Sequence, residues 1–213
     1  MTTTFEEKGK GYPIRTEFNA KNGDMTIGFA VDFNSAGEKL TKRLVQKHHG
    51  ENHFCEIHVD QIEPIVAARK IYQMARNDNI KTLNIAGNGI YSYVDKNKNW
   101  NQDKINQYVY SVLKQVIEGA KTQGNPFEIQ KIYTGGQTGA DWAGAVAAHA
   151  LGIECLVTFP LGFIQRNKNK ETIYNNKENL EKTIIKDVAS LNKNLNMFDI
   201  NDYFKDVINF NFN

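Results

Sequence analysis

The fold of this chain is decided by residues 128–159, EIQKIYTGGQTGADWAGAVAAHALGIECLVTF. The first six residues predict a buried strand, and residues 140–151 predict an Ala-rich helix that ends at Gly152. Residues 153–159 predict the next strand. Between strand and helix lies TGGQTG, residues 134–139, which holds more glycine than a plain turn needs. This order of elements predicts two parallel strands joined by a helix.

The same alternation extends upstream. Further strands are predicted at residues 25–33, 53–59 and 81–86. One helix starts at Ser35 and Glu38, which have the spacing of a capping box, a second at Pro64, and a third at Asn101. Residues 171–191 are predicted to be mainly helical. We therefore predict an α/β domain over residues 24–192, a Rossmann-like three-layer sandwich with a mainly parallel sheet.

Composition narrows the possible functions. The chain has 213 residues and a net charge of +2, too small for a general polyanion binder, so a nucleic-acid partner is unlikely. It has no run of about 20 apolar residues and its first residues lack the apolar stretch of a signal peptide, so we expect a cytoplasmic protein with no membrane partner. Its two cysteines, Cys55 and Cys155, lie in predicted strands, which excludes a disulfide framework.

The ends of the chain lie outside the predicted domain. Residues 1–23 read as a polar N-terminal extension, and residues 193–213 as an aromatic C-terminal tail. Because the tail is more aromatic than a solvated end requires, we expect a homo-oligomer, with the tail or the helix at residues 101–119 at the interface. The frequent asparagines near the C-terminus suggest an AT-rich genome, such as that of a phage or a low-GC bacterium.

Ligands of open parallel sheets bind beyond the carboxyl ends of the strands. Four loops there are rich in small residues, at 33–37, 86–89, 134–141 and 160–163. Small residues let main-chain N–H groups approach an anion, so phosphate is the expected ligand. The candidate ligand-binding residues are Asn34, Ser35, Gly37, Gly87, Asn88, Gly89, Thr134, Gly135, Gly136, Gln137, Thr138, Gly139, Asp141, Pro160, Gly162 and Arg166.

The strongest of these signals is TGGQTGAD, residues 134–141, which is neither a P-loop nor a GxGxxG fingerprint. In a purely structural interpretation the glycines make a tight turn, Thr138 caps the helix and Asp141 completes a capping box. Asp141 and Asp32 are the candidate catalytic carboxylates, because they are the ones close to the predicted rim.

Other residues keep two interpretations. Trp142 could stack on a base or pack against the sheet, and Tyr91 and Tyr93 could flank a ligand ring or fill a loop. Arg166, with Lys168 and Lys170, could neutralise phosphates or simply be solvated. His53, Cys55 and His58 have metal-binding side chains, but in a strand His58 would face away from the other two, so no metal is expected.

Residues 133–162, YTGGQTGADWAGAVAAHALGIECLVTFPLG, resemble the SLOG superfamily. Its Rossmannoid members include molybdenum-carrier-like proteins, the DNA-processing protein DprA and the LOG cytokinin-activating phosphoribohydrolases. FAVDFNSAGEKLT, residues 29–41, and LNIAGNGIY, residues 83–91, look like a phage and bacterial branch of it. The resemblance implies a nucleotide-derived ligand with phosphate on residues 135–139. Trp142 and Leu161 stand where molybdenum-carrier-like proteins have arginine and lysine.

Two functions follow from these observations. The first is a binding protein that captures an ADP-ribose-like or cyclic-nucleotide signal, as a sensor or as a phage-encoded sponge that sequesters an immune signal. The alternative is a nucleotide hydrolase or phosphoribohydrolase that cleaves an N-glycosidic or phosphate bond with Asp141 or Asp32. DNA binding of the DprA type is disfavoured by the charge of +2. No cofactor is expected in either case.

Overall fold

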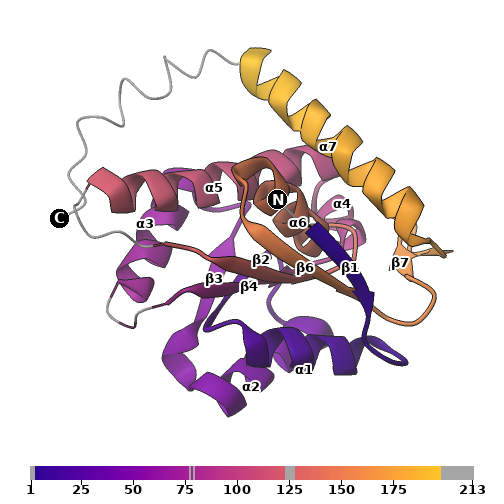
Figure 1. Ribbon diagram of the computed structural model, residues 1–213, viewed down its shortest axis with the longest axis horizontal. Helices are drawn as coiled ribbons and strands as arrows, with labels where there is room; N and C mark the ends of the chain where they lie inside the picture. Colours follow the sequence, from indigo (N-terminus) through magenta and orange to yellow (C-terminus); the bar gives the residue numbers. More distant parts are fainter. Residues whose placement is uncertain (1–2, 77, 79, 123–127, 198–213) are drawn as a thin grey trace.

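Six parallel strands form the central sheet of the computed structural model, which describes residues 3–76, 78, 80–122 and 128–197 (Figure 1). Every pair of neighbouring strands is parallel. The strands in spatial order are β1 (Thr3–Glu7), β6 (Glu154–Phe159), β5 (Lys131–Gly135), β4 (Thr82–Gly87), β2 (Met25–Ala30) and β3 (Phe54–His58). The Rossmann-like α/β prediction is confirmed.

Helices cover both faces of the sheet, because the central strands are apolar on both sides. Two helices, α1 (Tyr12–Asn22) and α2 (Ala36–His49), lie on one face. The other face carries α3 (Pro64–Ala75), α5 (Gln102–Thr122) and α6 (Ala140–Leu151), with α7 (Lys177–Met197) packed against α5 and α6. A short helix, α4 (Ile90–Lys96), follows β4. The three layers are therefore helix, sheet and helix.

The segment expected as a polar extension supplies β1 and α1. Strand β1 pairs with β6 along its whole length, from Thr3 opposite Cys155 to Glu7 opposite Phe159. Strand β1 lies at the edge of the sheet and buries only one side chain, Phe5. Because the residues on both sides of Phe5 are polar or charged, the strand has no apolar run that could be recognised in the sequence. Helix α1 buries Arg15 and Asn19 as well as Ala20, so it lacks the apolar stripe that reveals most helices.

The C-terminal helix starts later than expected. Residues 171–176 precede it and include β8 (Thr172–Ile173), which pairs antiparallel with β7 (Gln165–Arg166). The helix begins after Asn176, whose side-chain oxygen accepts a hydrogen bond from the Asn179 N–H at 2.9 Å. This contact is a side-chain cap of the kind that fixes helix starts.

The strand order places a crevice between β2 and β4. Strand β2 leads through α2 to β3 on one side, whereas β4 leads through α5 to β5 on the other. At such a reversal the loops beyond the two strands diverge and leave room for a ligand. These loops hold residues 31–35 and 88–89, so the fold itself marks the place where a site is expected.

Two other expectations concern the interface and the membrane. The apolar residues of α5, among them Ile105, Val109 and Val112, are buried in the core of the same chain and are not available to a partner. The last residues of the aromatic tail, 198–213, lie outside the described residues. Within the described part of the chain, no helix combines the length and the apolar character needed to cross a membrane.

Candidate functional site

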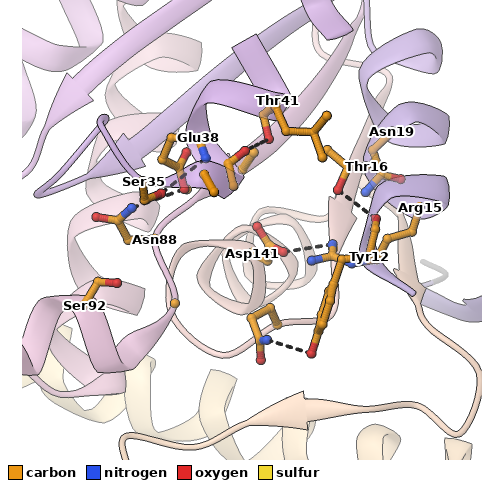
Figure 2. Close-up of a pocket in the computed structure, with 18 of the residues that line it drawn as sticks. Tyr12, Arg15, Thr16, Asn19, Ser35, Glu38, Thr41, Asn88, Ser92 and Asp141 are labelled. Carbon is orange, nitrogen blue, oxygen red and sulfur yellow. Dashed lines mark hydrogen bonds and ion pairs between the residues drawn. The ribbon is translucent and has the colours of Figure 1, made fainter. Parts of the chain in front are cut away.

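A cavity of about 390 Å³ opens at the carboxyl ends of β2, β4 and β5. Its walls come from α1, from the start of α2, from the loop after β4 and from the loop after β5. Figure 2 shows side chains of α1 and α2 on two sides, with Arg15 and Asp141 pointing toward each other. The predicted site residues that line this cavity are Ser35, Gly37, Gly87, Asn88, Gly89, Gly135, Gln137, Asp141 and Arg166.

A buried ion pair joins α1 to α6 in the cavity wall. Arg15 Nη1 donates to Asp141 Oδ2 at 3.0 Å, and the two side chains are only 10% and 7% exposed. Burial raises the pKa of Asp141, while the Arg15 guanidinium and the Gln137 main-chain N–H act in the opposite direction. Gly135 lies against this pair, and a Cβ there would overlap both charged groups. Glycine at this position is therefore required by the ion pair.

A second carboxyl group, that of Glu38, lies in the same wall. Ser35 Oγ accepts from the Glu38 N–H at 3.3 Å, so the predicted cap of α2 is present. The Glu38 side chain does not return to Ser35; its Oε1 accepts from Asn88 Nδ2 at 3.2 Å. Burial, with the nearby Asp141 carboxylate, raises the pKa of Glu38 to about 7. The cavity thus contains a carboxyl group that changes charge near neutral pH.

Asn88 holds the two loops of the crevice together. Its Oδ1 accepts from the main-chain N–H groups of Val31 and Asp32, each at 3.0 Å. Its Nδ2 donates to the Asp32 carbonyl and to Glu38. All the usual hydrogen bonds of this amide are therefore made within the protein, and Asn88 positions Glu38.

Three buried polar atoms of cavity-lining residues have no hydrogen-bond partner among the described residues: Arg15 Nε, Glu38 Oε2 and Asn84 Oδ1. Their residues are 8%, 5% and 2% exposed, respectively. A buried polar group without a partner costs about 1–3 kcal/mol, and native proteins keep few of them. All three atoms belong to residues that line the same cavity.

The TGGQTG loop is held by its own neighbours. The Gly139 N–H donates to Gln102 Oε1 at 2.7 Å, and Gln102 Nε2 donates back to the Gly139 carbonyl at 2.9 Å. Three more N–H groups of the turn also have acceptors inside the protein: Gly136 (Thr158 carbonyl, 2.8 Å), Thr138 (Gln137 Oε1, 3.1 Å) and Ala140 (Asn88 carbonyl, 3.0 Å). These four N–H groups, which a phosphate in this loop would need as donors, already donate hydrogen bonds within the protein.

Gly136 and Thr138 point away from the cavity. A Cβ at Gly136 would overlap the ring of Phe159, and the Thr138 hydroxyl donates to the Arg166 carbonyl. The capping-box interpretation is wrong, because Gly139 is the N-cap of α6 without a side-chain cap and Asp141 pairs with Arg15. The predicted residues that do not line the cavity are Asn34, Thr134, Gly136, Thr138, Gly139, Pro160 and Gly162.

The two predicted catalytic carboxylates are placed differently. Asp141 lines the cavity, whereas Asp32 is exposed outside its lining, where Oδ1 accepts from the Asn34 N–H at 2.8 Å. Glu38, and not Asp32, lines the cavity together with Asp141. In the sequence Glu38 was visible only as a capping residue.

The aromatic candidates divide between core and cavity. Trp142 is 3% exposed, stacks against Phe5 and donates from Nε1 to Asp187 Oδ2 at 2.7 Å, so it packs in the core and links α6 to α7. Tyr93 is buried and donates to the Phe29 carbonyl at 2.7 Å. Tyr91 alone of the predicted aromatic residues lines the cavity.

The remaining cations and metal-type side chains lie apart. Lys170 pairs with Asp95 at 3.0 Å, and Lys168 is exposed outside the cavity lining. His53 Nδ1 contacts the Asp24 carbonyl at 2.7 Å, and burial raises the pKa of the Cys55 thiol to about 12. No group of three or more His, Cys, Asp or Glu side chains within the described ranges could hold a metal ion.

One wall of the cavity was not predicted from the sequence. Tyr12, Arg15, Thr16 and Asn19 line it from α1. Their spacing of three, four and seven residues after Tyr12 is that of one helix face. This polar face, in a helix whose start is marked by Pro13, was the signal that could have revealed them.

Comparison with known protein families identifies the family of this chain. A family model described as the circularly permutated YpsA SLOG family matches residues 3–117, more than half of the 213 residues. Comparisons with curated proteins and with solved structures give no significant match. The matched residues include Arg15, Glu38 and Asn88 of the cavity. The chain therefore belongs to the circularly permutated YpsA family of the SLOG superfamily.

Proposed function

We propose that the cavity binds a nucleotide-derived small molecule and that the protein acts as a sensor or a sequestering protein for it. Membership of a SLOG family indicates binding or processing of a nucleotide-related ligand. The observation that carries the proposal is the set of three unpartnered buried polar atoms, on Arg15, Glu38 and Asn84, around one cavity. A bound polar molecule would supply the missing partners.

The position and size of the cavity support the same proposal. It lies at the reversal of strand order between β2 and β4, where open α/β sheets bind their ligands. Its volume of about 390 Å³ is near the lower end of the usual range for small-molecule sites, about 300–1,000 Å³. A cyclic mononucleotide suits this volume better than a larger ADP-ribose-like molecule.

One observation favours a second candidate, a hydrolase. Glu38 is a buried carboxyl group whose pKa is raised to about 7, and Asp141 lies near enough to affect it. A carboxyl group that is partly protonated at neutral pH can donate a proton to a leaving base while water adds to the sugar carbon that the base leaves. In this candidate function Glu38, rather than Asp32, is the proton donor.

One experiment separates the two candidates. The protein is incubated with a panel of mononucleotides and cyclic nucleotides, desalted, denatured, and the released molecules are identified by mass spectrometry. We expect an intact nucleotide to be recovered. A new free base or ribose phosphate that is lost in Glu38→Gln would establish the hydrolase instead, and a panel that is neither retained nor converted would overturn the proposed function.

The setting of this function is also a proposal. We propose that the protein acts in the cytoplasm as a homo-oligomer, and that a phage-encoded copy would sequester an immune signal of the host. The aromatic composition of residues 198–213 supports assembly, since so many aromatic side chains in a terminal segment favour burial.

A further inference from the structure

The TGGQTG loop already holds a negative charge that belongs to the chain itself. The Asp141 carboxylate accepts hydrogen bonds from the Gln137 main-chain N–H and from Arg15 Nη1, the latter at 3.0 Å (Figure 2). The remaining four N–H groups of residues 136–140 donate to other acceptors inside the protein. Main-chain N–H groups and a guanidinium are the donors that a phosphate would need here. The phosphate position of this loop is therefore filled by Asp141.

The start of α2 also has acidic groups of its own. Glu38 lies in the first turn of this helix, and Asp32, just before the helix, accepts from the Asn34 N–H at 2.8 Å. Burial, and then the nearby carboxylates of Asp141 and Asp32, raises the pKa of Glu38 to about 7, so both aspartates lie close to this residue. A phosphate at this turn would lie beside carboxylates and be repelled by them.

The two arginines of the cavity lining offer little to a phosphate. Arg15 is neutralised by Asp141, and the two side chains are buried together. Arg166 is exposed and lies over the Tyr12 ring, 5.6 Å from its centroid. Solvent and salt screen an ion pair at an exposed side chain, so a phosphate that contacts Arg166 gains little affinity.

The unpartnered polar atoms of the cavity require uncharged groups instead. Glu38 Oε2 and Asn84 Oδ1 are acceptors without a donor among the described residues, and Arg15 Nε is a donor without an acceptor there. Asn84 lies two residues before Ala86 on β4, so both residues face the cavity. An ionised phosphate oxygen has no hydrogen to donate to the two acceptors. Sugar hydroxyls and the N–H groups of a base can donate to them, and they bring no charge into the cavity.

We infer that the cavity recognises the nucleoside part of its ligand and that a phosphate adds little to the affinity. Hydroxyl or amino groups of the nucleoside donate to Glu38 Oε2 and Asn84 Oδ1, while Asp141 keeps phosphate out of the TGGQTG loop. This inference rests on the proposed nucleotide binding and specifies which part of the ligand is bound. The ligand class is then nucleosides, with or without a phosphate.

The first test is isothermal titration calorimetry of the wild-type protein at pH 8, where Glu38 is mostly ionised because its pKa is about 7. Adenosine, guanosine, cytidine and uridine are each compared with their 5′-monophosphate and their 3′,5′-cyclic monophosphate. For the base that binds, we expect both phosphate forms to bind less than about fivefold more tightly than the nucleoside, as for one exposed ion pair. A phosphate form that binds more tightly than this would overturn the inference.

A second test removes the carboxylate that fills the loop. Asp141→Asn leaves the Arg15 guanidinium without an anion, and we expect the 5′-monophosphate to gain about tenfold or more in affinity relative to the nucleoside. Asp32→Asn is the matched control, because it removes an exposed carboxylate that accepts from a main-chain N–H instead of a cation. The affinity ratio should change by less than about threefold in this control. The same change in both variants would contradict the role of Asp141, and if Asp141→Asn does not fold, the wild-type comparison still decides.

A third measurement tests the hydrogen-bond donors of the ligand. Analogues of the bound nucleoside that each lack one sugar hydroxyl or one N–H group of the base are titrated under the same conditions. We expect at least one analogue to lose about fivefold or more in affinity, because a buried acceptor then stays unpaired. Full affinity for every analogue would contradict donation to Glu38 and Asn84.

The possible failures are distinguishable. If neither a nucleoside nor a nucleotide of the panel binds the wild-type protein, the proposed function fails and this inference with it. If nucleotides bind while nucleosides do not, or if nucleosides bind more than about fivefold less tightly, the inference is wrong and the proposed function stands.

Discussion

Asp141 lies three residues beyond Thr138 and has the spacing of a capping residue, yet its carboxylate pairs with Arg15 from the other end of the chain. The same exchange of roles is seen at Glu38, which has a cap position but directs its carboxyl group to Asn88. Spacing along a helix fixes where a side chain starts, whereas tertiary neighbours decide which partner it finds. Both carboxyl groups therefore lie in the wall of the cavity.

Breaking the buried pair should be costly. Arg15→Met leaves the Asp141 carboxylate buried without its cation, and we expect the free energy of unfolding to fall by about 3–5 kcal/mol. The double variant Arg15→Met/Asp141→Leu removes both charges and should recover most of this loss. Urea unfolding measures both. Lys182→Met, which breaks the exposed pair with Glu178, should cost less than about 0.5 kcal/mol. An equal effect of Arg15→Met and Lys182→Met would contradict the role of the pair.

Glu38 should make stability depend on pH. The pKa of this carboxyl group is raised in the folded state to about 7 from its usual 4.5, so the folded protein keeps a proton that the unfolded chain releases. The stabilising contribution is therefore present below pH 4.5, falls as the pH rises through this window, and is lost above about pH 7. Because one pKa unit equals about 1.4 kcal/mol, the total change is about 3 kcal/mol.

The variant Glu38→Gln, which mimics the protonated group, isolates this effect. At pH 8 it should be more stable than wild type by about 3 kcal/mol, and at pH 5 by about 1 kcal/mol or less. Urea unfolding at the two pH values is the measurement. A difference between variant and wild type that is the same at both pH values would show that Glu38 titrates normally.

Two glycines of the predicted phosphate loops should respond in opposite ways to a methyl group. Gly136→Ala forces a Cβ into the Phe159 ring and should lower the free energy of unfolding by about 1–3 kcal/mol. Gly37→Ala lies in the first turn of α2, where the nearest atom is Ser35 Oγ at 4.0 Å, and should raise stability by about 0.5 kcal/mol. Thermal unfolding of the two variants checks both signs, and a stable Gly136→Ala protein would refute the tight packing of this loop.

Among the elements, β1 and α1 matter most for the site, since α1 supplies one wall of the cavity and β1 fixes where α1 starts. Phe5 anchors this strand: it is 4% exposed and packs against Trp142 and Phe159. We expect Phe5→Ala to cost about 3–5 kcal/mol. Thr4→Ala, on the exposed side of the same strand, should cost less than about 0.5 kcal/mol in the same denaturation experiment. Similar losses for both would mean that β1 is not anchored through Phe5.

Most helices and strands could be predicted from the sequence because each has a local sequence pattern. Alternating apolar runs and helix caps identified β2 to β6 and α2, α3, α5 and α6. Helix α1 could not be found in this way, because its buried face carries Arg15 and Asn19, and their burial is favourable only beside Asp141 and Thr158. The cavity could likewise be predicted only in part. Its loops of small residues were predicted, but its ion pair joins residues 126 positions apart and so gives no local sequence pattern.

In the whole molecule, the reversal of strand order between β2 and β4 brings the diverging loops, α1 and the start of α6 around one cavity. The TGGQTG loop, expected to bind phosphate, instead connects this assembly: it bonds to α5 through Gln102, to the loop after β4 through Asn88, and to β7 through Gln165 and Arg166. The cavity-lining residues that keep a buried polar atom without a partner among the described residues are Arg15 of α1, Glu38 of α2 and Asn84 of β4, and there we propose to place the ligand.

A crystal structure of the protein with the mononucleotide that it binds most tightly decides whether this cavity is the nucleotide site. We expect density for the nucleotide between α1 and α2, with hydrogen bonds to at least one of Glu38 Oε2, Asn84 Oδ1 and Arg15 Nε, which now lack partners among the described residues. An empty cavity with the nucleotide bound elsewhere, or these three atoms still without a partner in the complex, would contradict the assignment.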